Sequence, residues 1–189
     1  MRRVTGQDGD VTFAFVSGDP ALDLTGTVKS RRDNPLDALT APGDLERWVA
    51  ACDGLPDHVT ADAATFESAL ALREATYRLA LDRVLDRPFD PDSLGVVNAT
   101  AAGTPPTLTL GDAGLRMTGD LPAVLSHLAR SAMTVLADPH ARLKECGRPS
   151  CTRIYLDRSR GARRTWCGMD ECGNRVKAAA YRARRRAAP

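Results

Sequence analysis

The chain has 189 residues, 43% of them hydrophobic and 26% charged, with a formal net charge of +2. This length allows one domain with a substantial core and a small additional module. No apolar run approaches the roughly 20 residues needed to span a bilayer, and the first residues lack the apolar segment of a secretory signal, so we expect a cytoplasmic protein without a membrane partner.

The first two thirds of the chain has mainly helical patterns. A polar start over residues 1–10 is expected to be irregular, and weak alternation over residues 11–15 predicts a short strand. Asp19-Pro20 is typical of a helix N-terminus, since the aspartate can cap the helix and proline suits its first position. In chain order, we expect helices over residues 19–29, 44–51, 60–86, 90–101 and 120–138.

Two short runs, residues 107–110 and 115–118, are separated by a turn with glycine at each end, which predicts a β-hairpin. A lone hairpin is marginally stable in water, so we expect residues 11–15 to supply a third strand. Asp138-Pro139 ends the last helical pattern. We therefore divide the chain into an α-rich domain over residues 1–140 and a small module over residues 141–189.

Four of the five cysteines form two pairs with equal spacing, Cys146 with Cys151 and Cys167 with Cys172. Such pairs are typical ligands of a structural zinc ion, and the intervening segment is long enough to bring them together. Two disulfides or four unrelated thiols are the alternatives, but disulfides are rare in a reducing cytosol. We expect one zinc ion per chain and interpret Cys52 as a buried apolar residue.

The segment between the cysteine pairs predicts a second hairpin, with strands over residues 152–156 and 162–166. Cys172 would then lie in the first turn of a helix, and this order is that of a treble-clef zinc finger. We expect Trp166, together with Ile154 or Leu156, to pack near the metal. The predicted fold class is α+β: a mainly helical N-terminal domain with a small antiparallel hairpin or sheet, plus a treble-clef-like finger.

Basic residues concentrate in the C-terminal module. From residue 141 onward the sequence has fourteen Lys and Arg against four Asp and Glu, a formal +10, while the remainder has twelve against twenty, or −8. Because phosphate contacts supply most non-specific affinity for nucleic acids, this division predicts a polyanion-binding module on an acidic domain. Candidate nucleic-acid contacts are Arg163, Arg164, Arg175, Lys177, Arg182, Arg184, Arg185 and Arg186.

The final helix has a narrow apolar stripe formed by Val176, Ala180, Ala183 and Ala187, which we expect to pack on the zinc module. The remaining faces are cationic. Asn174 and Arg175 directly follow a predicted metal ligand, so either a structural role or DNA contact fits them.

The motif Cys172-Gly173-Asn174-Arg175, preceded by Trp166-Cys167 and Arg163-Arg164, resembles the CGNR zinc finger. In that family the finger follows a helical domain called ABATE, which is associated with stress-related transcription regulation. Residues 13–24 resemble the start of that domain. Where the family often continues with Asn-Thr, this chain has Gly26-Thr27.

The main hypothesis is a zinc-dependent, DNA-binding transcription regulator whose N-terminal domain senses a small molecule or stress. The alternatives are a protein-interaction or RNA-binding zinc module, and a thiolate redox switch. We do not expect an enzyme, because the histidines lack partners for nucleophilic catalysis and four cysteine ligands close a zinc site. A homodimer is compatible with the sequence, although no heptad or other pattern indicates one.

Overall fold

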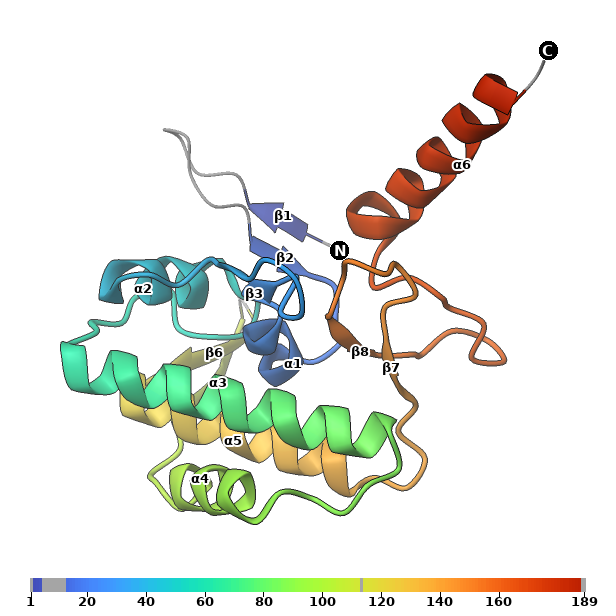
Figure 1. The fold of residues 1–189 in the computed structure, drawn as a ribbon. Helices are drawn as coiled ribbons and strands as arrows, with labels where there is room; N and C mark the ends of the chain where they lie inside the picture. Colours follow the sequence, from blue (N-terminus) through green and yellow to red (C-terminus); the bar gives the residue numbers. More distant parts are fainter. Residues whose placement is uncertain (1, 5–12, 113, 188–189) are drawn as a thin grey trace.

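The computed structural model describes residues 2–4, 13–112 and 114–187. It shows a helical body with small β-ribbons at its side, and a C-terminal helix that extends away from the body (Figure 1). The helices of the body are α1 (Pro20–Thr25), α2 (Pro42–Ala51), α3 (Ala63–Val84), α4 (Pro91–Ala101) and α5 (Leu121–Ala137).

Local sequence explains where most of these helices begin. Asp19, Asp62, Asp90 and Asp120 are the N-caps of α1, α3, α4 and α5, and each side chain accepts a hydrogen bond from a backbone N–H in the first turn. The long helices α3 and α5 lie side by side and pack against α1 and α4 (Figure 1). The helices predicted after residue 40 are confirmed, with ends shifted by a few residues.

In the part of the chain that the structure describes, the strands form four separate antiparallel pairs. They are β1 (Arg2–Val4) with β2 (Phe13–Phe15), β3 (Val28–Lys29) with β4 (Leu36–Asp37), β5 (Thr107–Gly111) with β6 (Gly114–Thr118), and β7 (Leu143–Glu145) with β8 (Ile154–Leu156). The fold is therefore α+β with small antiparallel sheets, as predicted.

The expected third strand of the β5–β6 hairpin is wrong. Phe13–Phe15 pairs with Arg2–Val4, so residues 2–4 are not irregular, while residues 5–12 lie outside the described part of the chain. The β5–β6 hairpin is held to the body differently, because Met117 packs against the main core. Packing on the main core replaces the missing strand.

The first predicted helix ends four residues early. Gly26 is the C-cap of α1, and the Thr25 and Thr27 hydroxyls donate to the Leu22 and Leu24 carbonyls at 2.8 and 2.7 Å. Val28 then pairs with Asp37. Backbone pairing thus overrides the helical pattern beyond the cap.

The connection between β3 and β4 contacts the C-terminal module. The Ser30 hydroxyl donates to the Ser150 carbonyl at 2.9 Å, and Arg32 pairs with Glu145. Arg31 pairs with Glu74, and its guanidinium lies 4.0 Å from the centroid of the Tyr77 ring. Residues 30–35 therefore hold β7 and the first cysteine pair beside the helical body.

Among the residues described, no helix is both long and apolar enough to cross a membrane.

Candidate metal centre and basic surface

The first cysteine pair lies in the connection between β7 and β8. The Cys146 N–H donates to the Arg153 carbonyl at 2.9 Å, which continues the ladder beyond β7. The Cys151 N–H donates to the Arg148 carbonyl at 2.8 Å and closes a turn. These backbone hydrogen bonds bend the chain so that both thiols face the same point.

The second pair lies at the start of the C-terminal helix. A π-helical turn (Met169–Gly173) contains Cys172 and runs directly into α6 (Asn174–Ala187). The Cys167 N–H donates to Cys146 Sγ at 3.4 Å, so the two pairs are linked through backbone as well as through sulfur. Cys172 lies in the first turn of the helix, as predicted.

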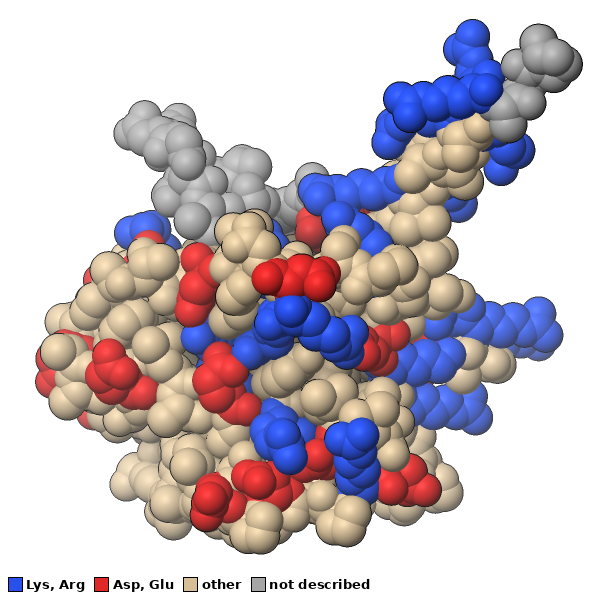
Figure 2. Space-filling view, viewed as in Figure 1, with Lys and Arg blue, Asp and Glu red and all other residues tan. Residues whose placement is uncertain are grey.

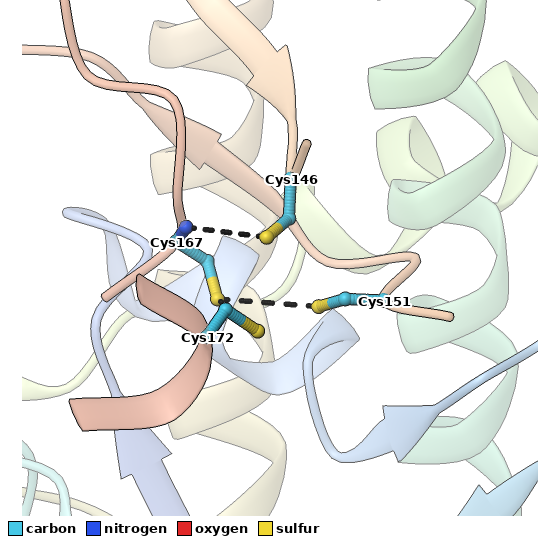
Figure 3. Close-up of side chains that lie close together, drawn as sticks. All are labelled: Cys146, Cys151, Cys167 and Cys172. Atoms are coloured by element: carbon cyan, nitrogen blue, oxygen red, sulfur yellow. Dashed lines mark hydrogen bonds between the residues drawn. The ribbon is translucent and has the colours of Figure 1, made fainter. Parts of the chain in front are cut away.

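The four cysteine side chains point toward one another (Figure 3). Their sulfur atoms all lie within 4.8 Å of one another, with Cys167 and Cys172 at 3.6 Å and Cys151 and Cys167 at 4.0 Å. A tetrahedral zinc ion with Zn–S bonds of about 2.3 Å requires sulfur atoms about 3.8 Å apart. All five cysteines are free thiols. The cluster therefore fits one zinc ion, as predicted.

The environment shifts the pKa values of the cluster thiols in different directions. Hydrogen bonds from the Cys151, Cys167 and Cys172 thiols lower the pKa of Cys146. The pKa of Cys167 is raised, first by its hydrogen bond to Cys146. A bound dication would lower the pKa of all four thiols, so that all four sulfurs could bind it as thiolates. Since four protein ligands close the coordination shell, a zinc ion here would act structurally.

A small second core surrounds the cluster. Val16 and Tyr155 are buried against the cysteines, and Trp166 packs at its edge. Gly147 and Gly173 each follow a cysteine, and a Cβ built on either would come within 3.2 Å of the Trp166 ring. Trp166 thus fills the space between the two cysteine pairs, and both glycines permit its close approach. The predicted packing of Trp166 near the metal is confirmed.

Strand β8 separates the two cores. Its side chains alternate, so Ile154 and Leu156 pack in the main core while Tyr155 packs on the cysteine cluster. The prediction that Ile154 or Leu156 lies near the metal is therefore wrong by one position along the strand. The sequence showed that side chains alternate along this strand, but it did not show which of the two faces lies next to the metal site.

Arg153 joins the cysteine module to the body. Its side chain is 6% exposed, and its guanidinium donates to the Ala14 carbonyl at 2.7 Å and the Gly26 carbonyl at 3.1 Å. A Cβ on Gly26 would lie 3.0 Å from Arg153 Nε. Gly26 therefore leaves room for this arginine. Nothing in the local sequence pattern singled out Arg153.

The predicted return strand over residues 162–166 is wrong, since β8 pairs with β7. In residues 157–166, Gly161 and Ala162 have positive φ angles of 71° and 51°, which interrupt an extended strand. Side chains satisfy the backbone instead, because Lys144 Nζ donates to the carbonyls of Ala162 and Arg164 at 2.6 and 3.2 Å. The treble-clef assignment stays a prediction.

Lys144 also contacts the buried carboxylate of Asp157 at 2.8 Å. Burial would raise the pKa of Asp157, but hydrogen bonds from Lys144 and Ser159 outweigh it and hold the pKa well below its usual range. This ion pair anchors the loop after β8 to β7. Sequence analysis missed Lys144, which lies twenty residues from one of its carbonyl partners.

Arg164 is a structural residue of the module. Its guanidinium donates to the carbonyls of Val16 at 2.7 Å, Trp166 at 2.8 Å and Cys167. It also lies 4.4 Å from the centroid of the Tyr155 ring. The structure therefore turns this predicted nucleic-acid contact inward, where it orients the chain around the second cysteine pair.

The other predicted basic contacts lie on the surface. Arg163 is exposed on the loop after β8, and Arg175, Lys177, Arg182, Arg184, Arg185 and Arg186 are exposed on α6. Figure 2 shows Lys and Arg along α6 and in a second group at the right of the molecule, below α6, whereas the body carries Asp and Glu interspersed with Lys and Arg. The charge division in the sequence is thus a spatial division as well.

The predicted packing of the α6 apolar stripe is wrong. Val176 is half-buried, but Ala180 and Ala183 are exposed. The helix extends away from the module beyond its first turn (Figure 1). Because small alanines offer little apolar area, their stripe gives only a weak force for packing.

Two residues beside the metal ligands have distinct positions. Asn174 Nδ2 donates to Asp170 Oδ1 at 3.3 Å, within the turn that precedes α6. Arg148 Nη1 lies 3.9 Å from Cys172 Sγ, so a cation from the first cysteine loop contacts a ligand of the second pair. Arg148 and Arg175 line one groove together with Arg182. Arg148 was not among the predicted site residues, although it lies between two cysteines.

Comparison with family models gives two adjacent matches. Residues 18–139 match ABATE, described as "Putative stress-induced transcription regulator", and residues 142–185 match the CGNR zinc finger. No curated protein has a significantly similar sequence. The predicted resemblance to these two families is confirmed.

Proposed function

The chain belongs to the ABATE family and carries a C-terminal CGNR zinc finger, and from this premise we propose that it is a transcription regulator that binds duplex DNA. Zinc would be held by Cys146, Cys151, Cys167 and Cys172, and would fix the start of α6 against the β7–β8 connection. The metal supplies structure rather than catalysis, and we place the activity in the cytoplasm.

The observation that carries the proposal is the exposed, basic helix α6. It has 14 residues, so it is about 21 Å long, and an α-helix about 10–12 Å wide fits the major groove of B-DNA. The described side chains from Lys177 to Arg186 are all exposed. Alanines at positions 178, 179, 180 and 183 keep parts of the helix narrow, so that backbone phosphates can approach it closely.

The basic side chains are distributed around α6 at 100° per residue. Arg175, Arg182 and Arg186 share one face, whereas Lys177 and Arg184 lie on the opposite face. A helix within a groove can use both flanks, because phosphates line both walls. Arg163, on the loop after β8, adds a cation outside the helix. We do not include Arg164, since its guanidinium is bound to three carbonyls.

Salt dependence of DNA affinity tests this proposal. If about six of the exposed cations contact phosphates, the slope of log K against log salt is about −5.4, so affinity falls roughly 2,000-fold between 50 and 200 mM salt. The measurement is fluorescence anisotropy of a labelled random duplex with the full-length, zinc-loaded protein. The quadruple variant with alanine at Arg182, Arg184, Arg185 and Arg186 should reduce the slope by about 3.6.

The control replaces the exposed Arg87, which follows α3, and the exposed Arg116, which lies on β6, with alanine. This variant should keep the slope of the original protein. Equal loss of slope in both variants, or salt-independent binding of the original protein, would reject DNA binding through α6. Stronger competition by structured RNA than by duplex DNA would favour the RNA-binding alternative.

The N-terminal domain would provide the regulatory input. Its α3 and α5 helices contact α1, and α1 contacts β8, which carries the cysteine module. A ligand or stress signal that changes the packing of α1 would therefore act on the module through β8 and Arg153. Limited proteolysis of α6 with and without a bound effector would measure this coupling.

A further inference from the structure

A groove of about 580 Å³ lies where the helical body, the cysteine module and α6 meet. Phe15 and Val16 come from β2 and the residue after it, and Trp166 and Met169 come from the segment around Cys167. Arg163 and Lys177 complete the lining from the loop after β8 and from α6. Two parts of the chain that are distant in sequence, residues 15–16 and residues 163–177, therefore form one concave surface.

The floor of this groove is apolar and in part aromatic. The Trp166 ring is held in place because Gly147 and Gly173 both lie close to it. Met169 is 41% exposed, and Met side chains adapt well to flat ring surfaces. Phe15 is held by Trp48, with ring centroids 5.9 Å apart. A planar apolar group would thus meet a preformed surface.

The rim of the groove is cationic. Arg163 and Lys177 are both exposed, and within the described residues the lining contains no carboxylate. Ligand sites typically combine an apolar floor with a few charged groups in a volume of about 300–1,000 Å³. An aromatic ring on the floor and an acidic group at the rim would match both features of this groove.

We propose that this groove binds a small planar aromatic anion, such as an aromatic carboxylate, and that this ligand lowers the affinity of the protein for DNA. The second part rests on the proposed DNA-binding function. The ligand would neutralise Arg163 and Lys177, both of which belong to the proposed phosphate contacts. Loss of two phosphate contacts makes the salt slope shallower by about 1.8.

Calorimetric titration of the full-length, zinc-loaded protein with 2-naphthoate tests the site. We expect saturable binding of one 2-naphthoate per chain, and at least tenfold weaker binding of the neutral analogue 2-naphthamide. Arg163→Glu and Lys177→Glu should each weaken 2-naphthoate binding at least tenfold. The control variants Arg160→Glu and Arg186→Glu, exposed on the same loop and the same helix but outside the groove, should change it less than twofold.

Zinc content and circular dichroism establish that each variant is folded. A nuclear magnetic resonance readout locates the ligand, because Trp48 and Trp166 give the only two indole N–H signals. The Trp166 signal should shift more than that of Trp48, which is 1% exposed. No saturable binding, equal losses in groove and control variants, or a larger Trp48 shift would overturn the proposed site.

The DNA measurement separates the two proposals. Protein that binds DNA with a steep salt slope but does not bind 2-naphthoate would reject the groove and leave DNA binding intact. Protein that binds 2-naphthoate in the groove but does not bind DNA would reject DNA binding alone. An unchanged slope in saturating 2-naphthoate would reject the proposed regulation.

Discussion

Gly26 and Arg153 should be energetically coupled. Arg153 should make Gly26→Ala destabilising, although this substitution would otherwise increase the free energy of unfolding. Gly26 has φ −74° and ψ −3°, an ordinary right-handed conformation that alanine adopts easily. Replacing glycine by alanine in such a conformation usually stabilises a protein by about 0.4–1 kcal/mol, because the unfolded chain has fewer conformations. Here the new Cβ would lie 3.0 Å from Arg153 Nε and 3.1 Å from its Cζ.

The guanidinium of Arg153 cannot move aside freely, because it is buried and donates to two backbone carbonyls. Displacing it weakens hydrogen bonds from a charged group, each worth about 1.5–3 kcal/mol. We therefore expect Gly26→Ala to destabilise the protein by about 1 kcal/mol. Arg153→Met removes both donors and leaves two carbonyls without them, at a cost of about 3–5 kcal/mol.

In the Arg153→Met background the flexible thioether can yield, so Gly26→Ala should stabilise by about 0.4–1 kcal/mol. The coupling free energy of the double-mutant cycle is then about 1.5 kcal/mol or more. Gly26→Asn, which introduces a larger side chain than alanine, should destabilise the original protein at least as much as Gly26→Ala.

Urea denaturation of the zinc-loaded protein, followed by circular dichroism, measures these free energies of unfolding. Gly95→Ala is the matched control, since a Cβ at this position in α4 meets no atom within 4 Å. It should stabilise by about 0.5–1 kcal/mol in both backgrounds. If Gly26→Ala had the same effect, within about 0.5 kcal/mol, with and without Arg153, the proposed steric and hydrogen-bond coupling would be refuted.

Three further predictions concern the metal module and the core. Gly173→Ala places a Cβ 2.6 Å from Met169 Sδ and 3.2 Å from the Trp166 ring. A chelator should therefore remove zinc about tenfold faster from this variant than from the original protein. An unchanged rate of zinc removal would contradict this packing. Arg164→Lys should also speed zinc removal while preserving the salt slope of DNA affinity, whereas a slope shallower by about 0.9 would instead indicate a phosphate contact. Burial raises the pKa of the Cys52 thiol to about 12, whereas an unfolded cysteine has a pKa of about 8.5. The folded protein therefore retains this proton more strongly than the unfolded chain. The resulting contribution of Cys52 to the free energy of unfolding is present below pH 8.5 and is lost as the pH rises toward 12. Cys52→Ala should flatten the loss of stability between pH 8.5 and 10.5 in denaturation experiments, and parallel curves for the two proteins would exclude this role.

Features encoded by neighbouring residues were predictable. An aspartate followed by an apolar helical pattern marked the starts of α1, α4 and α5, and the structure places Asp19, Asp90 and Asp120 at those caps. The cysteine spacing predicted a four-sulfur cluster, because few other arrangements explain two equal pairs in so short a segment. The helix caps and the spacing within each cysteine pair both depend on residues close in sequence, so the structure agrees with what the sequence predicted.

Features that depend on distant partners were not predictable. Residues 162–166 were expected to return as the second strand of a hairpin, but β8 pairs with β7 instead. Arg164 was indistinguishable in the sequence from Arg163, yet one guanidinium binds three carbonyls and the other is exposed. Charge alone therefore identifies a basic region, while the available backbone acceptors decide which of its arginines are free to bind a partner.

The position of β8 implies that metal binding and the orientation of α6 are one event. Ile154 and Leu156 fix one face of β8 in the main core, and Tyr155 fixes the cysteine cluster to the other face. Cys172 joins that cluster to the first turn of α6, whose later turns make few contacts of their own with the body. The direction in which α6 leaves the body is therefore set mainly by the Cys146, Cys151, Cys167 and Cys172 cluster. Zinc removal should thus abolish the defined placement of the basic helix while the larger core, which holds Ile154, stays folded.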